Sequence, residues 1–375
     1  MKKVEKEVGE KHARHGVSEK EASGKHVHQR EKHAGQESAI TVHNLTKTFK
    51  TPKTLPGVSG FMRNLVAREY TQKTAVDSIS FEIGAGELVG FLGPNGAGKT
   101  TTMKMLSGVL YPTSGAVDVL GYVPFEKKPA FLRQIAFIMG QRSQLMWELP
   151  AMDTFRLNKA IYGVTDADFR KTVGVLADLL DAQSLLLQPA KTLSLGQRMK
   201  MELIAALLHR PKVLFLDEPT IGLDVVAQKI VRDFIKNYQR EFGATILLTS
   251  HYMEDIRRLA ERVIVISDGR LIYNGQLEIM VRKFATKKAI DVIVEDMPKT
   301  SDLAKVGMFP EMDFPHIRYH VPRKRVPELV QKISRHLVFV DMNVEEERVE
   351  DIVRGMFGRA HGVRPRQGST FTNSA

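Results

Sequence analysis

The chain has 375 residues, of which 43% are hydrophobic and 26% charged, and it contains no cysteine. This length allows two or three domains, whereas the lack of cysteine excludes disulfides, thiolate metal sites and a cysteine nucleophile. The sequence has no apolar run of 18 residues, and its charged start lacks an apolar stretch, so we expect neither a membrane span nor a secretory signal. The formal net charge of +12 favours acidic partners such as nucleic acid, anionic lipid or phosphate.

Residues 1–38 are rich in Lys, Glu, His, Gly and Ser and contain almost no apolar side chains. Such a segment cannot bury enough surface to order itself, and we expect a disordered extension. A metal-binding tail is the alternative, but the histidines lack a regular ligand spacing. These histidines are His12, His15, His26, His28 and His33.

From Ala39 onward, short apolar segments alternate with helical patterns. This alternation predicts an α/β domain with a largely parallel sheet. The hairpin expected over 262–274 turns at Asp268-Gly269. The other expected strands cover residues 40–49, 75–83, 87–93, 135–140, 213–217 and 244–249.

Basic residues gather between the first two expected strands, where a 51–69 insertion carries few acids. In 39–74 the only acid is Glu69. This segment could face nucleic acid, anionic lipid or simply water. Its basic residues are Lys47, Lys50, Lys53, Arg63, Arg68 and Lys73.

Helical periodicity replaces the strand pattern between residues 141 and 211, which predicts an inserted helical subdomain. From residue 286 to 358, strands and amphipathic helices indicate a small C-terminal α+β domain. The polar, basic residues 359–375 are expected to be disordered. The predicted fold is therefore α/β with a second, smaller α+β domain.

A glycine-rich segment, Gly93-Pro-Asn-Gly-Ala-Gly-Lys-Thr100, matches G-x-x-x-x-G-K-[ST] between a strand and a helix. Its glycines allow the backbone to wrap a phosphate chain, towards which the N–H groups and the helix N-terminus point. Lys99 is placed to reach the β- and γ-phosphates, and the Thr100 hydroxyl can bind Mg²⁺. The pattern predicts a nucleotide phosphate site.

Two carboxylates follow the expected strand 213–217. Asp217 ends the strand at the edge of the sheet that also carries the phosphate loop, so it is the expected Mg²⁺ partner. Glu218 is then placed to polarise a water molecule that attacks the γ-phosphate. His251 and Gln141, each at a strand end, could reach the same phosphate, but neither is specific alone.

The segment Thr192–Lys200, TLSLGQRMK, predicts a helix that starts at Ser194. Gly196 leaves the backbone open beside Gln197, which is suited to holding an anion at the helix N-terminus.

Together these motifs, in the order GPNGAGKTT, Gln141, LSLGQ, VLFLDEPT, IGLD (221–224) and TSH (249–251), resemble the ATP-binding cassette (ABC) family. The resemblance covers about residues 40–284 and implies a nucleotide-binding domain over 39–285. It implies a P-loop NTPase fold with a RecA-like α/β core, an antiparallel β subdomain and the helical subdomain at 141–211.

The resemblance also implies a role for each motif. Glu218 would be the general base, His251 would hold Glu218 and the γ-phosphate, and Gln141 would sense the nucleotide. Mg²⁺ would be bound by Thr100, Gln141 and Asp217. ATP would contact Gly93, Pro94, Asn95, Gly96, Ala97, Gly98, Lys99, Thr100, Thr101 and Asp217 of one chain, and Ser194, Gly196, Gln197 and Asp224 at the dimer seam.

An aromatic ring stacks on adenine upstream of the phosphate loop in this family. Tyr70 is the preferred candidate, because it keeps a short step into the strand 75–83. Phe49 is the alternative, because it follows LTK, as the ring often does. The 51–69 insertion separates the two.

The resemblance to the exporter branch, with drug and polysaccharide transporters, implies an ATPase subunit that drives a separate permease. One LSLGQ per chain implies an ATP-dependent homodimer or a pseudo-symmetric heterodimer, at the cytoplasmic face of the membrane. The apolar Leu145, Met146 and Trp147 would receive a permease helix, or would form core of the helical subdomain. A soluble ABC-type ATPase acting on nucleic acid is the alternative function.

Overall fold

The computed structural model describes residues 37–52, 70–140, 142–285, 287–346 and 349–360. Residues 1–36 of the predicted N-terminal extension, most of the basic insertion, Gln141 and residues 361–375 of the polar tail lie outside these ranges. None of the helices described here combines the length and apolar character needed to cross a bilayer.

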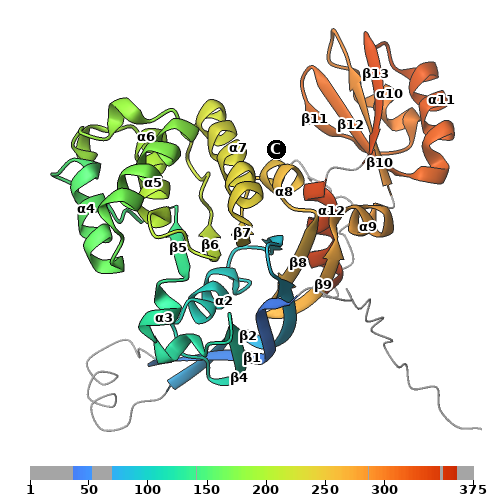
Figure 1. Ribbon diagram of the computed structural model, residues 1–375. Helices are drawn as coiled ribbons and strands as arrows, with labels where there is room; N and C mark the ends of the chain where they lie inside the picture. Colours follow the sequence, from blue (N-terminus) through green and yellow to red (C-terminus); the bar gives the residue numbers. More distant parts are fainter. Residues whose placement is uncertain (1–36, 53–69, 141, 286, 347–348, 361–375) are drawn as a thin grey trace, which may run out of the picture. The chain divides into compact units, whose positions relative to one another are not determined.

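A six-stranded sheet forms the centre of the domain expected over residues 39–285, in the order β5-β6-β7-β3-β8-β9 (Figure 1). All neighbours are parallel except β8 and β9, which form the predicted hairpin. The expected α/β fold with a largely parallel sheet is therefore confirmed. The strands are β3 (Leu88–Leu92), β5 (Ile135–Met139), β6 (Val213–Asp217), β7 (Thr245–Thr249), β8 (Arg262–Ser267) and β9 (Arg270–Gln276).

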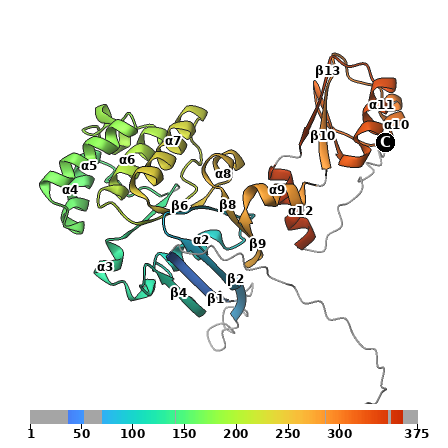
Figure 2. The ribbon, with the colours of Figure 1, turned by 45° about the vertical axis from the view of Figure 1, so that its right-hand side comes forward.

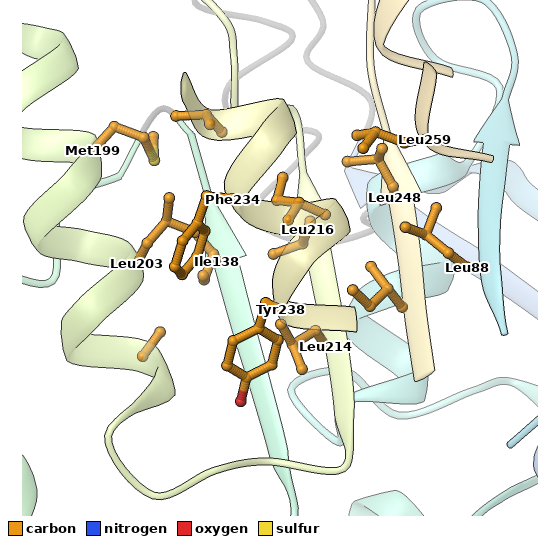
Figure 3. Close-up of a cluster of buried hydrophobic side chains, with 14 of the residues drawn as sticks. Leu88, Ile138, Met199, Leu203, Leu214, Leu216, Phe234, Tyr238, Leu248 and Leu259 are labelled. Atoms are coloured by element: carbon orange, nitrogen blue, oxygen red, sulfur yellow. The ribbon is translucent and has the colours of Figure 1, made fainter. Parts of the chain in front are cut away.

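Both faces of this sheet are buried, which explains the continuous apolar runs of its strands. In β6, Leu214 and Leu216 point to one core and Val213 and Phe215 to the other. Figure 3 shows the first core, where side chains of α6 and α7 pack on β5 and β6. The helices that contribute to it include α6 (Leu195–Leu207), α7 (Val225–Phe242) and α8 (Met253–Leu259).

The opposite face of the central sheet packs on α2 and on a three-stranded antiparallel sheet with the order β2-β1-β4 (Figure 2). This second sheet is the expected antiparallel β subdomain. Its elements and the connection to β5 are β1 (Ser38–Pro52), β2 (Tyr70–Gly84), α2 (Lys99–Leu106), β4 (Ser114–Val119), η1 (Pro124–Glu126) and α3 (Pro129–Leu132).

The helical segment between β5 and β6 contains α4 (Ala151–Tyr162), α5 (Asp166–Leu179), η2 (Gln183–Leu185), η3 (Ala190–Thr192) and α6. Thr165 caps α5 by accepting a hydrogen bond from the backbone N–H of Asp168, at 3.1 Å. Leu145 is buried in the same core as Phe155 and Leu176, so for this residue the structure agrees with the alternative in which it forms core of the helical subdomain. Trp147 is 49% exposed, as expected.

The C-terminal residues form a βαββαβ module with an antiparallel sheet in the order β11-β12-β10-β13. Ile290, Tyr319 and Ile333 lie in a core of its own. The elements are β10 (Lys287–Ile293), α10 (Thr300–Val306), β11 (Glu311–Asp313), β12 (His316–Pro322), η4 (Arg323–Arg325), α11 (Val326–His336) and β13 (Asp341–Glu346).

The last helix, α12 (Val349–Ala360), packs against α9 (Leu277–Phe284). The sequence placed it in the C-terminal module, over 286–358. Its buried Ile352 and Met356 instead share a core with Leu277 and Met280, in the domain built on the six-stranded sheet. The chain therefore leaves this domain after α9 and returns to it with α12.

Candidate functional site

The glycine-rich loop joins β3 to α2, whose first residue is Lys99. The Lys99 ammonium donates to the carbonyl oxygens of Gly93, at 2.6 Å, and Pro94, at 3.2 Å. Burial lowers the pKa of Lys99, while the nearby carboxylates of Glu218 and Asp217 act in the opposite direction. Gly98 has φ +103°, and a Cβ there would lie 2.4 Å from the Ala75 carbonyl oxygen. The tight fit and left-handed backbone both require glycine.

Asp217, at the end of β6, lies beside the first turn of α2. Its carboxylate accepts hydrogen bonds from the hydroxyls of Thr100 and Thr249, each at 2.7 Å. Among the described residues, no group of three or more His, Asp or Glu forms an all-protein metal cage. The hard oxygens of Thr100 and Asp217 fit Mg²⁺, which is usually held by one or two carboxylates together with substrate phosphates.

Glu218 adopts a left-handed backbone conformation, with φ +57°. Such a conformation is strained for a residue with a side chain, and strain of this kind gathers at functional sites. The Glu218 Oε1 lies 2.8 Å from His251 Nε2. The other oxygen, Oε2, is buried and has no hydrogen-bond partner in the part of the chain that the structure describes. The carboxylate is therefore oriented by His251 and keeps one oxygen available as an acceptor.

A buried carboxylate that the sequence reading missed, Asp255 on α8, connects the loops of this site. Asp255 accepts hydrogen bonds from the hydroxyls of Thr220, at 2.5 Å, and Ser250, at 2.6 Å. Arg232 of α7 lies 2.8 Å from its other oxygen. Thr220 follows Glu218 closely and Ser250 precedes His251, so Asp255 connects the turns that carry Glu218 and His251. A carboxylate four residues after His251 gave no signal of burial in the sequence.

Replacing Asp255 by Ala is expected to lower the free energy of unfolding by about 3–5 kcal/mol, because Arg232 is left buried without its partner. Urea denaturation measures the change. Glu254→Ala is the matched control, because its ion pair with Arg258 is exposed and should contribute less than about 1 kcal/mol. Equal stabilities of the two variants would contradict a structural role for Asp255.

A cavity of about 300 Å³ lies over the phosphate loop and is lined by Phe49, Lys73 and Ala75 as well as by the loop itself. Phe49 pairs with Lys73 across β1 and β2, whereas Tyr70 pairs with Pro52, three residues farther out. Three strand residues span about 10 Å. Tyr70, the preferred aromatic residue, is not among the lining residues, and the structure favours Phe49. β1 and β2 pair as far as Pro52 and Tyr70. Tyr70 is therefore closer than Phe49 to the phosphate loop in the sequence but farther out along the hairpin, and the prediction considered only the sequence.

A second cavity, of about 230 Å³, shares Thr100 and Glu218 with the first. Gly140 and Arg142, the neighbours of Gln141, also line it. Gln141 itself lies outside the described residues.

The predicted helix start at Ser194 is a complete capping box. The Ser194 hydroxyl accepts from the Gln197 N–H, at 3.2 Å, and the Gln197 side chain accepts from the Ser194 N–H, at 2.9 Å. A Cβ on Gly196 would lie 2.9 Å from that of Ala227, and one on Gly222 would lie 3.0 Å from the Leu195 side chain. The start of α6 therefore packs closely on the start of α7 and on the turn before it. Asp224 caps α7 by accepting a hydrogen bond from the Ala227 N–H, at 2.8 Å.

Sequence comparison relates the chain to transport ATPases. Residues 76–221 match the ABC transporter family. The linearmycin resistance ATP-binding protein LnrL of Bacillus subtilis (strain 168) is 28% identical over 305 residues, which are 78% of this chain and 97% of that protein. The ABC transporter ATP-binding protein NatA of the same organism is 35% identical, over 54% of this chain and 82% of that protein.

Nod factor export ATP-binding protein I of Paraburkholderia xenovorans (strain LB400) is 34% identical, over 61% of this chain and 73% of that protein. Among solved structures, an ATP-binding subunit of an ABC transporter has a TM-score of 0.55 and 26% identity, covering 66% of this chain and 93% of that one. The cassette MJ0796, as a dimer in a post-hydrolysis state bound to ADP and Pi, has a TM-score of 0.53 and 22% identity, over 64% and 98%.

Proposed function

This chain belongs to the ABC transporter ATP-binding proteins, and from that premise we propose that it hydrolyses ATP to drive a separate membrane permease, in the direction of export. The observation that carries the proposal is one cavity lined by the phosphate loop and Glu218, with Asp217 hydrogen-bonded to Thr100 and His251 paired with Glu218. The resistance and export functions named for LnrL and Nod factor export protein I support the direction.

In the proposed reaction, the loop N–H groups and Lys99 bind the β- and γ-phosphates of ATP. Glu218 accepts the proton of the attacking water, for which its unpartnered Oε2 is available. His251, held 2.8 Å from Oε1, fixes the carboxylate and contributes a donor to the γ-phosphate. Most of the acceleration comes from positioning and charge stabilisation, as is general for phosphoryl transfer.

Thr100, Asp217 and Gln141 are the proposed Mg²⁺ partners. When bound, Mg²⁺ neutralises charge on the phosphate oxygens. The contribution of the chain is to hold the Thr100 hydroxyl and the Asp217 carboxylate together, 2.7 Å apart. The position of Gln141 between Gly140 and Arg142, which line the second cavity, supports its assignment as a sensor.

We propose that ATP joins two such chains, with Ser194 of each chain facing the nucleotide of the other. Gly196 packs on Ala227, so the start of α6 lies beside the start of α7. Leu195, Val225 and Val226 are exposed at these two helix starts, which supports a seam with a second chain at this place. The N–H groups of Leu195 and Gly196, which the capping box does not use, suit a phosphate. Each active site then needs residues from two chains.

The proposed permease contact lies on the helical subdomain. Large apolar side chains are exposed there, which is typical of a surface that receives a partner helix. Trp147 and Leu149 follow the Gln141 position, and Leu157 and Ile161 form a stripe on α4. This placement supports a peripheral association with the cytoplasmic face of a membrane.

Affinity purification of the chain from detergent-solubilised membranes tests the permease proposal. We expect an integral membrane protein of about six apolar spans to copurify, each span needing about 20 residues. The proposal is contradicted if nucleic acid copurifies and no membrane protein does, an outcome that favours the nucleic-acid ATPase.

Phe49→Ala is expected to weaken ATP binding roughly 5- to 150-fold, because stacking of a base on an aromatic ring contributes about 1–3 kcal/mol. Isothermal titration calorimetry of the free chain measures this change. Tyr70→Ala is the control, since it does not line the cavity, and its affinity should stay within about twofold of wild type. The reverse pattern would restore Tyr70 as the adenine contact.

A further inference from the structure

Glu202 is a buried acid in the middle of α6, with 5% of its surface exposed. Its carboxylate accepts hydrogen bonds from the Ser143 hydroxyl, at 2.5 Å, and from the backbone N–H groups of Gln144, at 2.9 Å, and Leu145, at 3.4 Å. Burial raises the pKa of this carboxyl, although these hydrogen bonds favour the ionised form. Burying a carboxylate whose hydrogen-bond donors are only peptide N–H and hydroxyl groups destabilises the fold unless these donors are well placed.

Further contacts fix the same segment to the helical subdomain. The Met146 N–H donates to the Thr154 hydroxyl of α4, at 3.1 Å, and the Trp147 carbonyl accepts from the Lys191 N–H, at 2.9 Å. The Arg198 guanidinium, one turn before Glu202 on α6, lies 5.1 Å from the centre of the Trp147 ring. On the other side of Gln141, the Gly140 N–H donates to the Asp217 carbonyl of the central sheet.

We propose that Glu202 is a positioning residue that fastens the segment after Gln141 to α6, so that nucleotide contact at Gln141 moves the Ser194 end of the helix. This inference rests on the proposed roles of Gln141 and Ser194. Ser194 lies two helical turns from Glu202, about 12 Å along the axis. Because the helix is rigid over that length, a displacement at the nucleotide site of one chain also moves Ser194. Ser194 is the residue proposed to complete the nucleotide site of the other chain.

The only tryptophan of the chain, Trp147, reports on this segment directly. In nucleotide-free protein, Glu202→Ala is expected to raise acrylamide quenching of Trp147 fluorescence about twofold, because a released side chain can expose the half now covered. Glu202→Gln should be intermediate, since its amide oxygen still accepts. Glu202→Asp should resemble Ala, because the shorter side chain keeps its charge but loses reach. Glu241→Ala, an exposed glutamate on α7, is the matched control.

The second measurement adds Mg-ATP in a Glu218→Gln background, which retains the nucleotide. The parent should show a change in Trp147 emission, and Glu202→Ala should bind ATP without this change. Wild-type quenching and emission in a folded Glu202→Ala would overturn the proposal, as would a parent that binds ATP with no change at Trp147. The quenching measurement needs no nucleotide, so it tests the contact even if the parent failed to bind ATP, a result that would contradict the proposed function instead.

Discussion

Glu218→Gln is expected to reduce ATP turnover by about two to four orders of magnitude, the range for loss of a general base. Gln has nearly the same shape, so the turn after β6 and the contact with His251 should persist. What disappears is the basic oxygen, Oε2, which is buried and has no hydrogen-bond partner among the described residues. ATP binding should be unchanged, because the phosphate loop and Asp217 are untouched.

Phosphate release under saturating ATP measures the turnover, and equilibrium dialysis measures the binding. The variant should also accumulate as an ATP-held dimer in size-exclusion chromatography with light scattering, since the chemical step that reopens the dimer is blocked. Glu241→Gln, an exposed glutamate of α7, provides the same chemical change away from the site. Turnover within about threefold of wild type would remove Glu218 from the role of base.

The parts of the site that are specified by contiguous residues could be predicted from the sequence. A phosphate loop needs glycine where the backbone is left-handed or crowded, as at Gly98. The residues that meet these requirements are adjacent in the sequence, so they form a motif that can be recognised. Asp217 and His251 could be located because each follows an apolar strand of the parallel sheet. Parallel strands end at the same edge, so residues far apart in the sequence meet there.

The parts that depend on pairing and packing between distant segments could not be predicted. The choice between Tyr70 and Phe49 depends on the register of the β1–β2 hairpin, and no local pattern fixes a register across a long insertion. Glu202 and Asp255 look like ordinary solvent-facing acids of amphipathic helices, and only their partners show that they are buried. The amphipathic pattern of a helix such as α12 indicates that one face is buried, but it does not indicate which core buries that face.

Leu195 illustrates the same limit, because no pattern in the sequence indicates a role for its side chain. In the structure its side chain lies against Gly222, whose left-handed backbone forms the turn before α7. The residue is still 39% exposed at the first turn of α6, where the capping box uses the N–H groups of Ser194 and Gln197 but not those of Leu195 and Gly196. A side chain at this position therefore braces the neighbouring turn without closing the proposed phosphate site.

Ser194→Asp is expected to abolish ATP-dependent dimerisation while each chain still binds ATP. Aspartate is as good an N-cap as serine, so α6 should keep its first turn. Its negative charge would, however, occupy the point where the phosphate of the other chain is proposed to bind. Ser194→Arg should have the same effect through bulk, although it also loses the cap, at a cost of about 0.5–2 kcal/mol. Ser184→Arg, at an exposed serine of the same subdomain, controls for added charge and size.

Mixing two defective chains separates contact in trans from contact within one chain. A Lys99→Ala chain cannot hold its own ATP but keeps an intact Ser194, whereas a Ser194→Asp chain has the opposite defect. If Ser194 serves the nucleotide of the partner, the mixture contains one complete site, and differently tagged chains should form a mixed dimer with ATP. Neither chain alone should dimerise. If Ser194 acted on the ATP of its own chain, both sites of the mixture would be incomplete, and no mixed dimer would form.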